Sequence, residues 1–136
     1  MFDKICKKQF LDLLLTSSII VFILHYIALV YDLYWVIEWY DIPMHFLGGF
    51  TMGILATFIF FTSGYLPEFY KLRHNKFVVF VIIIMFTSVI GLGWELWELF
   101  VGFSDVVLDR IDTIKDLIMN TFGAIFAYFF LINKIK

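Results

Sequence analysis

The sequence predicts an all-α integral membrane protein, a four-helix transmembrane bundle, and three observations carry that prediction. Hydrophobic residues make up 62% of the 136-residue chain and charged residues only 16%, against about 45–50% and about 25% in soluble domains. Four apolar runs reach the roughly 20 residues that a helix needs to cross a bilayer. The runs are continuous and lack the alternation of β-barrel strands. The length fits a single transmembrane domain, residues 1–136.

The spans are expected at residues 10–31, 42–63, 77–101 and 113–132. Lysines precede the first run, as in a signal peptide, but the run is too long for one and lacks a convincing cleavage site, so we interpret it as a retained span. Tyr31, Trp35 and Trp39 follow it at intervals of four residues. Because such aromatic residues prefer the headgroup level, we expect an interfacial aromatic segment between the first two spans, with these residues on one helical face.

The basic residues predict the orientation of the helices. They gather before the first run, between the second and third, and after the fourth, while the other two connections contain only Arg110 and Lys115. Most acidic residues lie in or beside those two connections. The positive-inside rule therefore places both termini in the cytoplasm, in a multi-pass protein of the inner or plasma membrane. No basic stripe indicates nucleic acid binding, so the expected surroundings are the lipid bilayer.

The second and fourth spans carry packing signals. Pro43 stands at a helix start, where its missing N–H costs nothing. Gly49 and Gly53 form a GxxxG pair, which permits close approach of another helix. The fourth span has a stripe of polar and then small residues, which we expect to be the buried seam, with its phenylalanines facing lipid. The stripe consists of Asp112, Asp116, Asn120, Gly123 and Ala127.

Ionisable residues fall at a common depth on three of the runs. At a rise of about 1.5 Å per residue, His45 and Asp116 each lie about 6 Å inside the start of their helices, and Glu95 about 9 Å inside the end of its own. Charged groups at membrane depth persist mostly where they face a bundle interior, a wet cavity or a ligand. We therefore predict an outward-facing ligand site, with His25 and Asp32 as less central members. Its residues are Asp41, His45, Glu95, Glu98, Asp112, Asp116 and Asn120.

Histidine and carboxylates together can hold a divalent metal ion, and a catalytic site would keep a position open for water. Among the site residues we expect His45, Glu95 and Asp116 to be the metal ligands. Two close carboxylates that share a proton are the alternative. His45 is not part of an H-E-x-x-H helix, and the sequence has no nucleophile elbow around a serine.

Three motifs resemble those of a known family. They are Y-D-x-x-x-H-F-x-x-G at residues 40–49, aromatic-E-x-x-E at 94–98, and D-T-x-x-D at 112–116 followed by Gly-Ala at 123–124. This ordered set resembles the YjdF-like family of small bacterial inner-membrane proteins and, more distantly, the VanZ-like group linked to glycopeptide antibiotic resistance. The resemblance covers roughly residues 40–125, and the extra leading spans of YjdF-like proteins are not expected here. It implies a site at Asp41, His45, Glu95, Glu98, Asp112 and Asp116, and a role in the cell envelope.

Three functions stay open at this point. The first is binding of a divalent cation, or of the polar headgroup of a lipid or envelope compound, at the outer leaflet. The second is a metal-dependent intramembrane hydrolase or phosphotransferase that uses the same residues. The third is a small structural or transporter subunit. Because four short spans leave little room for an aqueous path, a transporter would require a homo-oligomer.

Overall fold

The computed structural model of the protein describes residues 2–102 and 110–135, and the regular structure in these ranges is helical. Four helices have segments long and apolar enough to cross a membrane, which confirms the predicted four-helix fold. The segments are Lys7–Val30, Asp41–Thr62, Lys76–Val101 and Ile111–Leu131. They belong to helices α1 (Phe2–Val30), α3 (Asp41–Thr57), α5 (Lys76–Val101) and α6 (Arg110–Leu131).

Short helices connect the long ones. A π-helical turn, η1 (Phe58–Thr62), continues α3, and α4 (Pro67–Lys71) and a 3₁₀ turn, η2 (Leu72–His74), lead into α5. Between α1 and α3 lies α2 (Leu33–Val36), a single turn. Asp32 before it has a left-handed φ of 54°, and Ile37 after it is extended, so the helix stops. The prediction of one helical face for the aromatic residues is therefore wrong, although Tyr31, Trp35 and Trp39 are all exposed.

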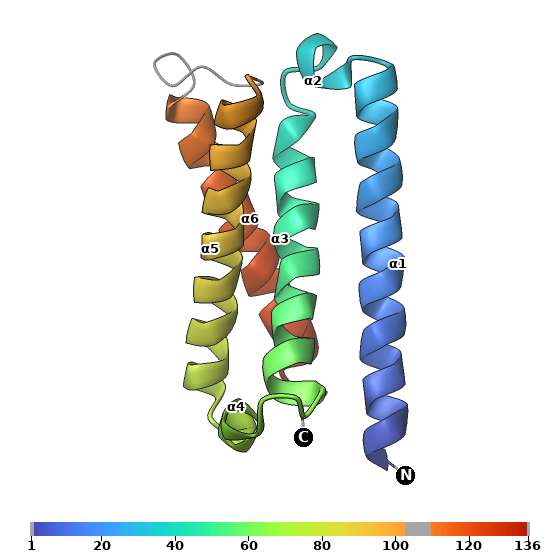
Figure 1. Ribbon diagram of the computed structural model, residues 1–136, viewed down its shortest axis with the longest axis vertical. Helices are drawn as coiled ribbons and strands as arrows, with labels where there is room; N and C mark the ends of the chain where they lie inside the picture. The colour runs from blue at the N-terminus through green and yellow to red at the C-terminus, as the bar shows by residue number, and fades with distance from the viewer. Residues whose placement is uncertain (1, 103–109, 136) are drawn as a thin grey trace.

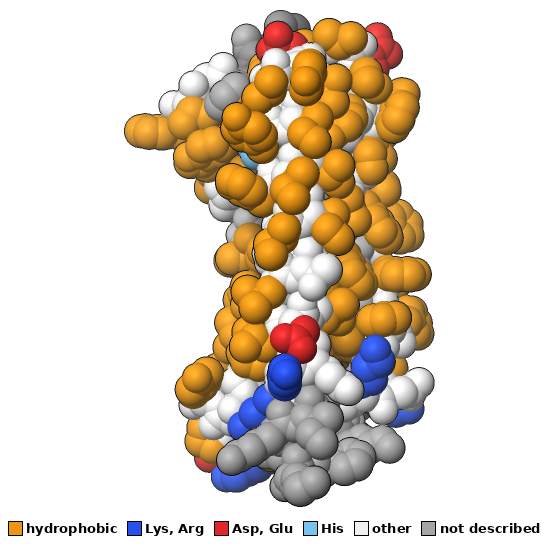
Figure 2. All heavy atoms as spheres, turned by 90° about the vertical axis from the view of Figure 1, so that its right-hand side faces the viewer, with side chains coloured by type: hydrophobic (Ala, Val, Ile, Leu, Met, Phe, Trp, Pro, Cys, Tyr) orange, Lys and Arg blue, Asp and Glu red, His pale blue; other side chains and the backbone are white. Residues whose placement is uncertain are grey.

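The long helices run side by side, and both chain ends lie at the end of the bundle that carries α4 (Figure 1). The turn α2 lies at the opposite end (Figure 1). On the face formed by α1, the basic side chains gather near the end with the termini and hydrophobic side chains cover the length between (Figure 2). This distribution of basic side chains is the one from which the positive-inside rule predicts orientation. The assignment of that end to the cytoplasm stays a prediction.

Helices α3 and α6 touch along their backbones. A Cβ atom added to Gly49 would collide with the backbone of Asn120, and one added to Gly123 would collide with the carbonyl oxygen of Phe46. One added to Gly53 would stand 2.7 Å from the Cβ of Ala127. The contact thus confirms the packing role predicted for the glycine pair and for the small residues of the fourth span. Phenylalanines on the other faces of α6 are exposed, as predicted.

Helix α5 presents a buried stripe to this pair. Val79, Ile83, Thr87, Gly91 and Glu95 are all buried and recur every fourth residue, so they share one face of the helix. The stripe begins in the hydrophobic core and ends in a carboxylate. Helix α1 is peripheral, because only 6% of its most apolar 18-residue segment is buried. The three-helix unit of α3, α5 and α6 therefore positions the polar residues.

Candidate functional site

The centre of the candidate site is the imidazole of His45. Asp41 lies one turn before it on α3, and its Oδ1 is 3.3 Å from His45 Nε2. Asp116 on α6 brings its own Oδ1 to 3.8 Å from the same nitrogen. Both His45 and Asp116 are buried, with 7% and 4% of their surface exposed. The close contact of α3 and α6 therefore places two carboxylates beside the same nitrogen of one imidazole ring.

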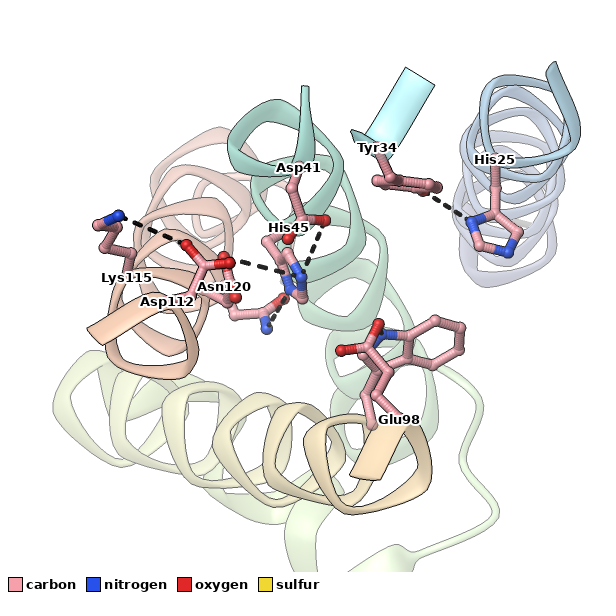
Figure 3. A network of polar contacts seen from close by, with 10 residues as sticks. His25, Tyr34, Asp41, His45, Glu98, Asp112, Lys115 and Asn120 are labelled. Atoms are coloured by element: carbon pink, nitrogen blue, oxygen red, sulfur yellow. Dashed lines mark hydrogen bonds and ion pairs between the residues drawn. The ribbon is translucent and has the colours of Figure 1, made fainter. Parts of the chain in front are cut away.

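Asn120 holds the other side of that ring. Its Nδ2 lies 3.2 Å from His45 Nδ1, and Figure 3 shows the ring between Asn120 and Asp41. With the amide in this orientation Nδ2 is the donor, so a neutral imidazole accepts at Nδ1 and carries its proton on Nε2, which faces Asp41 and Asp116. The ring is thus fixed from both sides, with a donor directed at the carboxylates.

Asp41, His45 and Asp116 could together hold a metal ion, because one ligand atom from each lies within 4.8 Å of the others. In a tetrahedral zinc site with bonds of about 2.0–2.1 Å, neighbouring ligand atoms stand about 3.3 Å apart. The two distances from Nε2, 3.3 and 3.8 Å, are close to that value. This group shares His45 and Asp116 with the expected set of His45, Glu95 and Asp116, and ligation by Glu95 stays a prediction.

Glu95 is nevertheless buried beside this group, with 5% of its surface exposed, at the end of the α5 stripe. Its Oε1 has no hydrogen-bond partner among the described residues. A buried carboxylate oxygen without a partner is costly, and native proteins rarely leave one without a reason. Because Glu95 also lines a cavity, a ligand or solvent in that cavity would supply the missing partner.

That cavity, of about 330 Å³, lies at the α2 end of the bundle. None of the described residues that line it is a lysine or arginine. Six are acidic, so the excess of negative charge favours a cationic ligand. We call it the acidic cavity. The six are Glu38, Asp41, Glu95, Glu98, Asp112 and Asp116.

The wall toward α1 is held by aromatic residues. Tyr34 Oη is 2.7 Å from His25 Nδ1, and Tyr40 donates to the carbonyl of Leu24 at 3.1 Å. Burial, and then the negative charge of Asp41, raises the pKa of the Tyr34 phenol above its usual value. The phenol therefore stays neutral. Sequence reasoning missed Tyr34, because its position depends on the turn at α2, which no motif marks.

The remaining predicted residues surround this centre at different depths. Glu98 is partly buried and accepts a hydrogen bond from Trp94 Nε1 at 2.7 Å (Figure 3). Asp112 is exposed at the rim and pairs with Lys115 at 3.4 Å. His25 lines the acidic cavity, whereas Asp32 is exposed and is not among its lining residues. The other predicted residues therefore line one or both of the cavities beside His45, whereas Asp32 lies apart.

Comparison with family models matches residues 3–135 to the family described as "Predicted membrane protein (DUF2238)". This match covers nearly the whole chain and agrees with the four spans. No curated protein and no solved structure matches the chain.

Proposed function

We propose that this chain, which belongs to the DUF2238 family of predicted membrane proteins, binds a divalent cation through Asp41, His45 and Asp116. The observation that carries the proposal is the convergence of these three donors from two helices beside the acidic cavity, which Asp41 and Asp116 line together with other carboxylates. Three protein ligands leave further coordination positions for water or a bound compound. The resemblance to YjdF-like and VanZ-like proteins would place this role in the cell envelope.

The donor set favours particular metals. Imidazole suits zinc and other transition metals, whereas carboxylates suit magnesium, calcium and manganese. A mixed set of one imidazole and two carboxylates makes Zn²⁺ or Mn²⁺ the expected ion. Glu95, Glu98 and Asp112 would add negative charge around it without all being ligands, and the rim position of Asp112 would attract cations to the entrance.

Asn120 has a defined role in this proposal. Ligation through His45 Nε2 requires the ring proton to move to Nδ1, where it needs an acceptor. Rotation of the Asn120 amide by half a turn would present Oδ1, instead of Nδ2, to that nitrogen. Hydrogen bonds of this kind fix the tautomer of metal-bound histidines. Metal binding would therefore be accompanied by proton transfer and by the reversal of one amide.

The first test is the metal content of the purified protein after loading with Zn²⁺ or Mn²⁺. We expect about one tightly bound ion per chain, lost in Asp116→Asn. Asp112→Asn is the matched control, because Asp112 lies one turn earlier on α6 and is exposed. Thermal unfolding should show that both variants are folded. Equal metal content in wild type and Asp116→Asn would refute the proposal.

A second candidate function is favoured by the unpartnered Oε1 of Glu95. A carboxylate beside a metal-bound water can accept its proton, which is the arrangement of a metal-dependent hydrolase or phosphotransferase. In that case Glu95→Gln would retain the ion and abolish turnover. A structural or transporter subunit, acting as a homo-oligomer, would instead lose stability in the Asp116 and Glu95 variants without any loss of ligand.

A further inference from the structure

A second cavity, of about 350 Å³, lies between α1, α3 and α5. We call it the apolar groove. Its sides are formed by hydrophobic residues of all three helices, including Phe22 on α1, Met52 on α3 and Ile90 on α5. Ser18 on α1 also lines it. A groove of this size can hold part of a small amphiphilic molecule.

The apolar groove continues the acidic cavity. His25, Tyr34, Asp41, Trp94 and Glu98 line both spaces. The carboxylates of Asp41 and Glu98 therefore stand at a junction between a polar chamber and an apolar one. The proposed ligand His45 lines the groove as well, so the cation would lie beside this junction. This arrangement is suited to a molecule with a polar head and a hydrocarbon tail.

Helix α1 forms an open side of the groove. Among the described residues, α1 packs mainly against α2, α3 and η1, and has little contact with α5. It stands at one edge of the bundle, beyond α3 from the side of α6 (Figure 1). Both α1 and α5 contain candidate membrane spans, so the outer surfaces of these helices would meet hydrocarbon in a bilayer. A groove lined by both helices is therefore placed to receive a lipid tail.

Two buried hydroxyl groups line the groove without a partner. Thr51 on α3 and Thr87 on α5 are 3% and 1% exposed, and each Oγ1 lacks a hydrogen-bond partner among the described residues. Thr87 lies about 12 Å along α5 from Glu95, toward the middle of the helix. Hydroxyl donors at this depth match an acceptor in the ligand, such as an ester carbonyl, better than they match a plain hydrocarbon.

We propose that the apolar groove holds an acyl chain of a membrane glycerophospholipid whose phosphate binds the cation held by Asp41, His45 and Asp116. This inference rests on the proposed cation site. No lysine or arginine is found among the described residues that line either cavity, so a phosphate would be repelled by the carboxylates unless a cation lay between them. Divalent ions held by few carboxylates commonly complete their coordination with phosphate oxygens. Lipid binding should therefore depend on the metal.

Native mass spectrometry of the full chain in detergent can test this, because it resolves bound metal and bound lipid in one spectrum. The probe is phosphatidylglycerol, added with Zn²⁺ or Mn²⁺ or with EDTA. Ser18→Phe fills the groove from α1 and leaves the proposed metal ligands unsubstituted, and Ile19→Phe, at an exposed position that does not line the groove, is the matched control. Soluble glycerol 3-phosphate distinguishes phosphate recognition from recognition of the tail.

We expect a lipid adduct that requires the metal and that Ser18→Phe weakens roughly tenfold, since overpacking of this size opposes the tail. The same variant should keep its metal, and Ile19→Phe should behave as wild type. If the metal binds but the lipid adduct is insensitive to EDTA or to Ser18→Phe, the lipid inference fails alone. The same conclusion follows if glycerol 3-phosphate binds as tightly as the lipid. If no metal binds, both proposals fail.

Discussion

His45 and Asp116 lie on different helices, yet His45 Nε2 and Asp116 Oδ1 come within 3.8 Å of each other. The approach is possible because Gly49 and Gly123 let the backbones of α3 and α6 touch directly beside this pair. A larger residue at either glycine would collide with the backbone of the facing helix and so move the two helices apart. The polar site and the packing of the bundle therefore depend on the same interface.

Gly49→Ala should separate α3 from α6. The added Cβ would meet the backbone of Asn120, which cannot rotate away, so we expect a loss of about 1–3 kcal/mol or more in unfolding free energy. Gly48→Ala is the control, because the nearest atom to its Cβ would be Asn120 Oδ1 at 3.7 Å, an ordinary contact. Thermal unfolding in detergent measures both, and equal melting temperatures would contradict the close packing.

Substitutions of Asn120 should distinguish the two tautomers of the His45 ring, with the proton on Nε2 or on Nδ1. Asn120→Leu removes any acceptor for Nδ1–H, and we expect metal affinity to fall by roughly 10–100-fold, as for other hydrogen-bond partners of metal-bound histidines. Asn120→Asp offers only acceptors to Nδ1 and should retain binding. Isothermal titration calorimetry measures both affinities, with the ion, Zn²⁺ or Mn²⁺, that binds the wild-type protein. Equal affinities for the two variants would rule out this role of Asn120.

Tyr34 should make stability depend on alkaline pH. Its pKa is raised by burial above the usual value of 10.0, so the folded state favours the neutral phenol. That contribution is complete below pH 10 and is lost as the pH rises through the pKa of the folded state. Unfolding measured between neutral pH and pH 11 should therefore show a steeper loss in wild type than in Tyr34→Phe. Tyr26→Phe, at an exposed position, should follow wild type.

The predicted orientation can be tested with single cysteines in a Cys6→Ser background. Glu38 lies at the α2 end and Glu68 in α4, at the opposite end. If both termini are cytoplasmic, a membrane-impermeant maleimide added to intact cells should label Glu38→Cys and spare Glu68→Cys until the membrane is permeabilised. The reverse pattern would place the acidic cavity at the cytoplasmic face and overturn the prediction of an outer-leaflet site.

Much of the architecture follows from the sequence because the bilayer constrains it strongly. A long apolar run in lipid must satisfy its backbone groups within itself, so run length and composition determine helices and their approximate ends. Ionisable residues at membrane depth likewise mark a buried cluster, since lipid would not tolerate them alone. For these reasons His45, Glu95, Asp116 and Asn120 were identifiable as inward-facing before their contacts were known.

The tertiary structure alone decided which of these residues meet. Spacing places His45, Glu95 and Asp116 at a similar depth, but the rotation and contact of the helices bring Asp41 into the group with His45 and Asp116. The turn at Asp32 likewise directs Tyr34 to His25, and the loose packing of α1 leaves the apolar groove open. Helical periodicity fixes depth and face along one helix, whereas distances between helices arise from side-chain packing that no single run encodes.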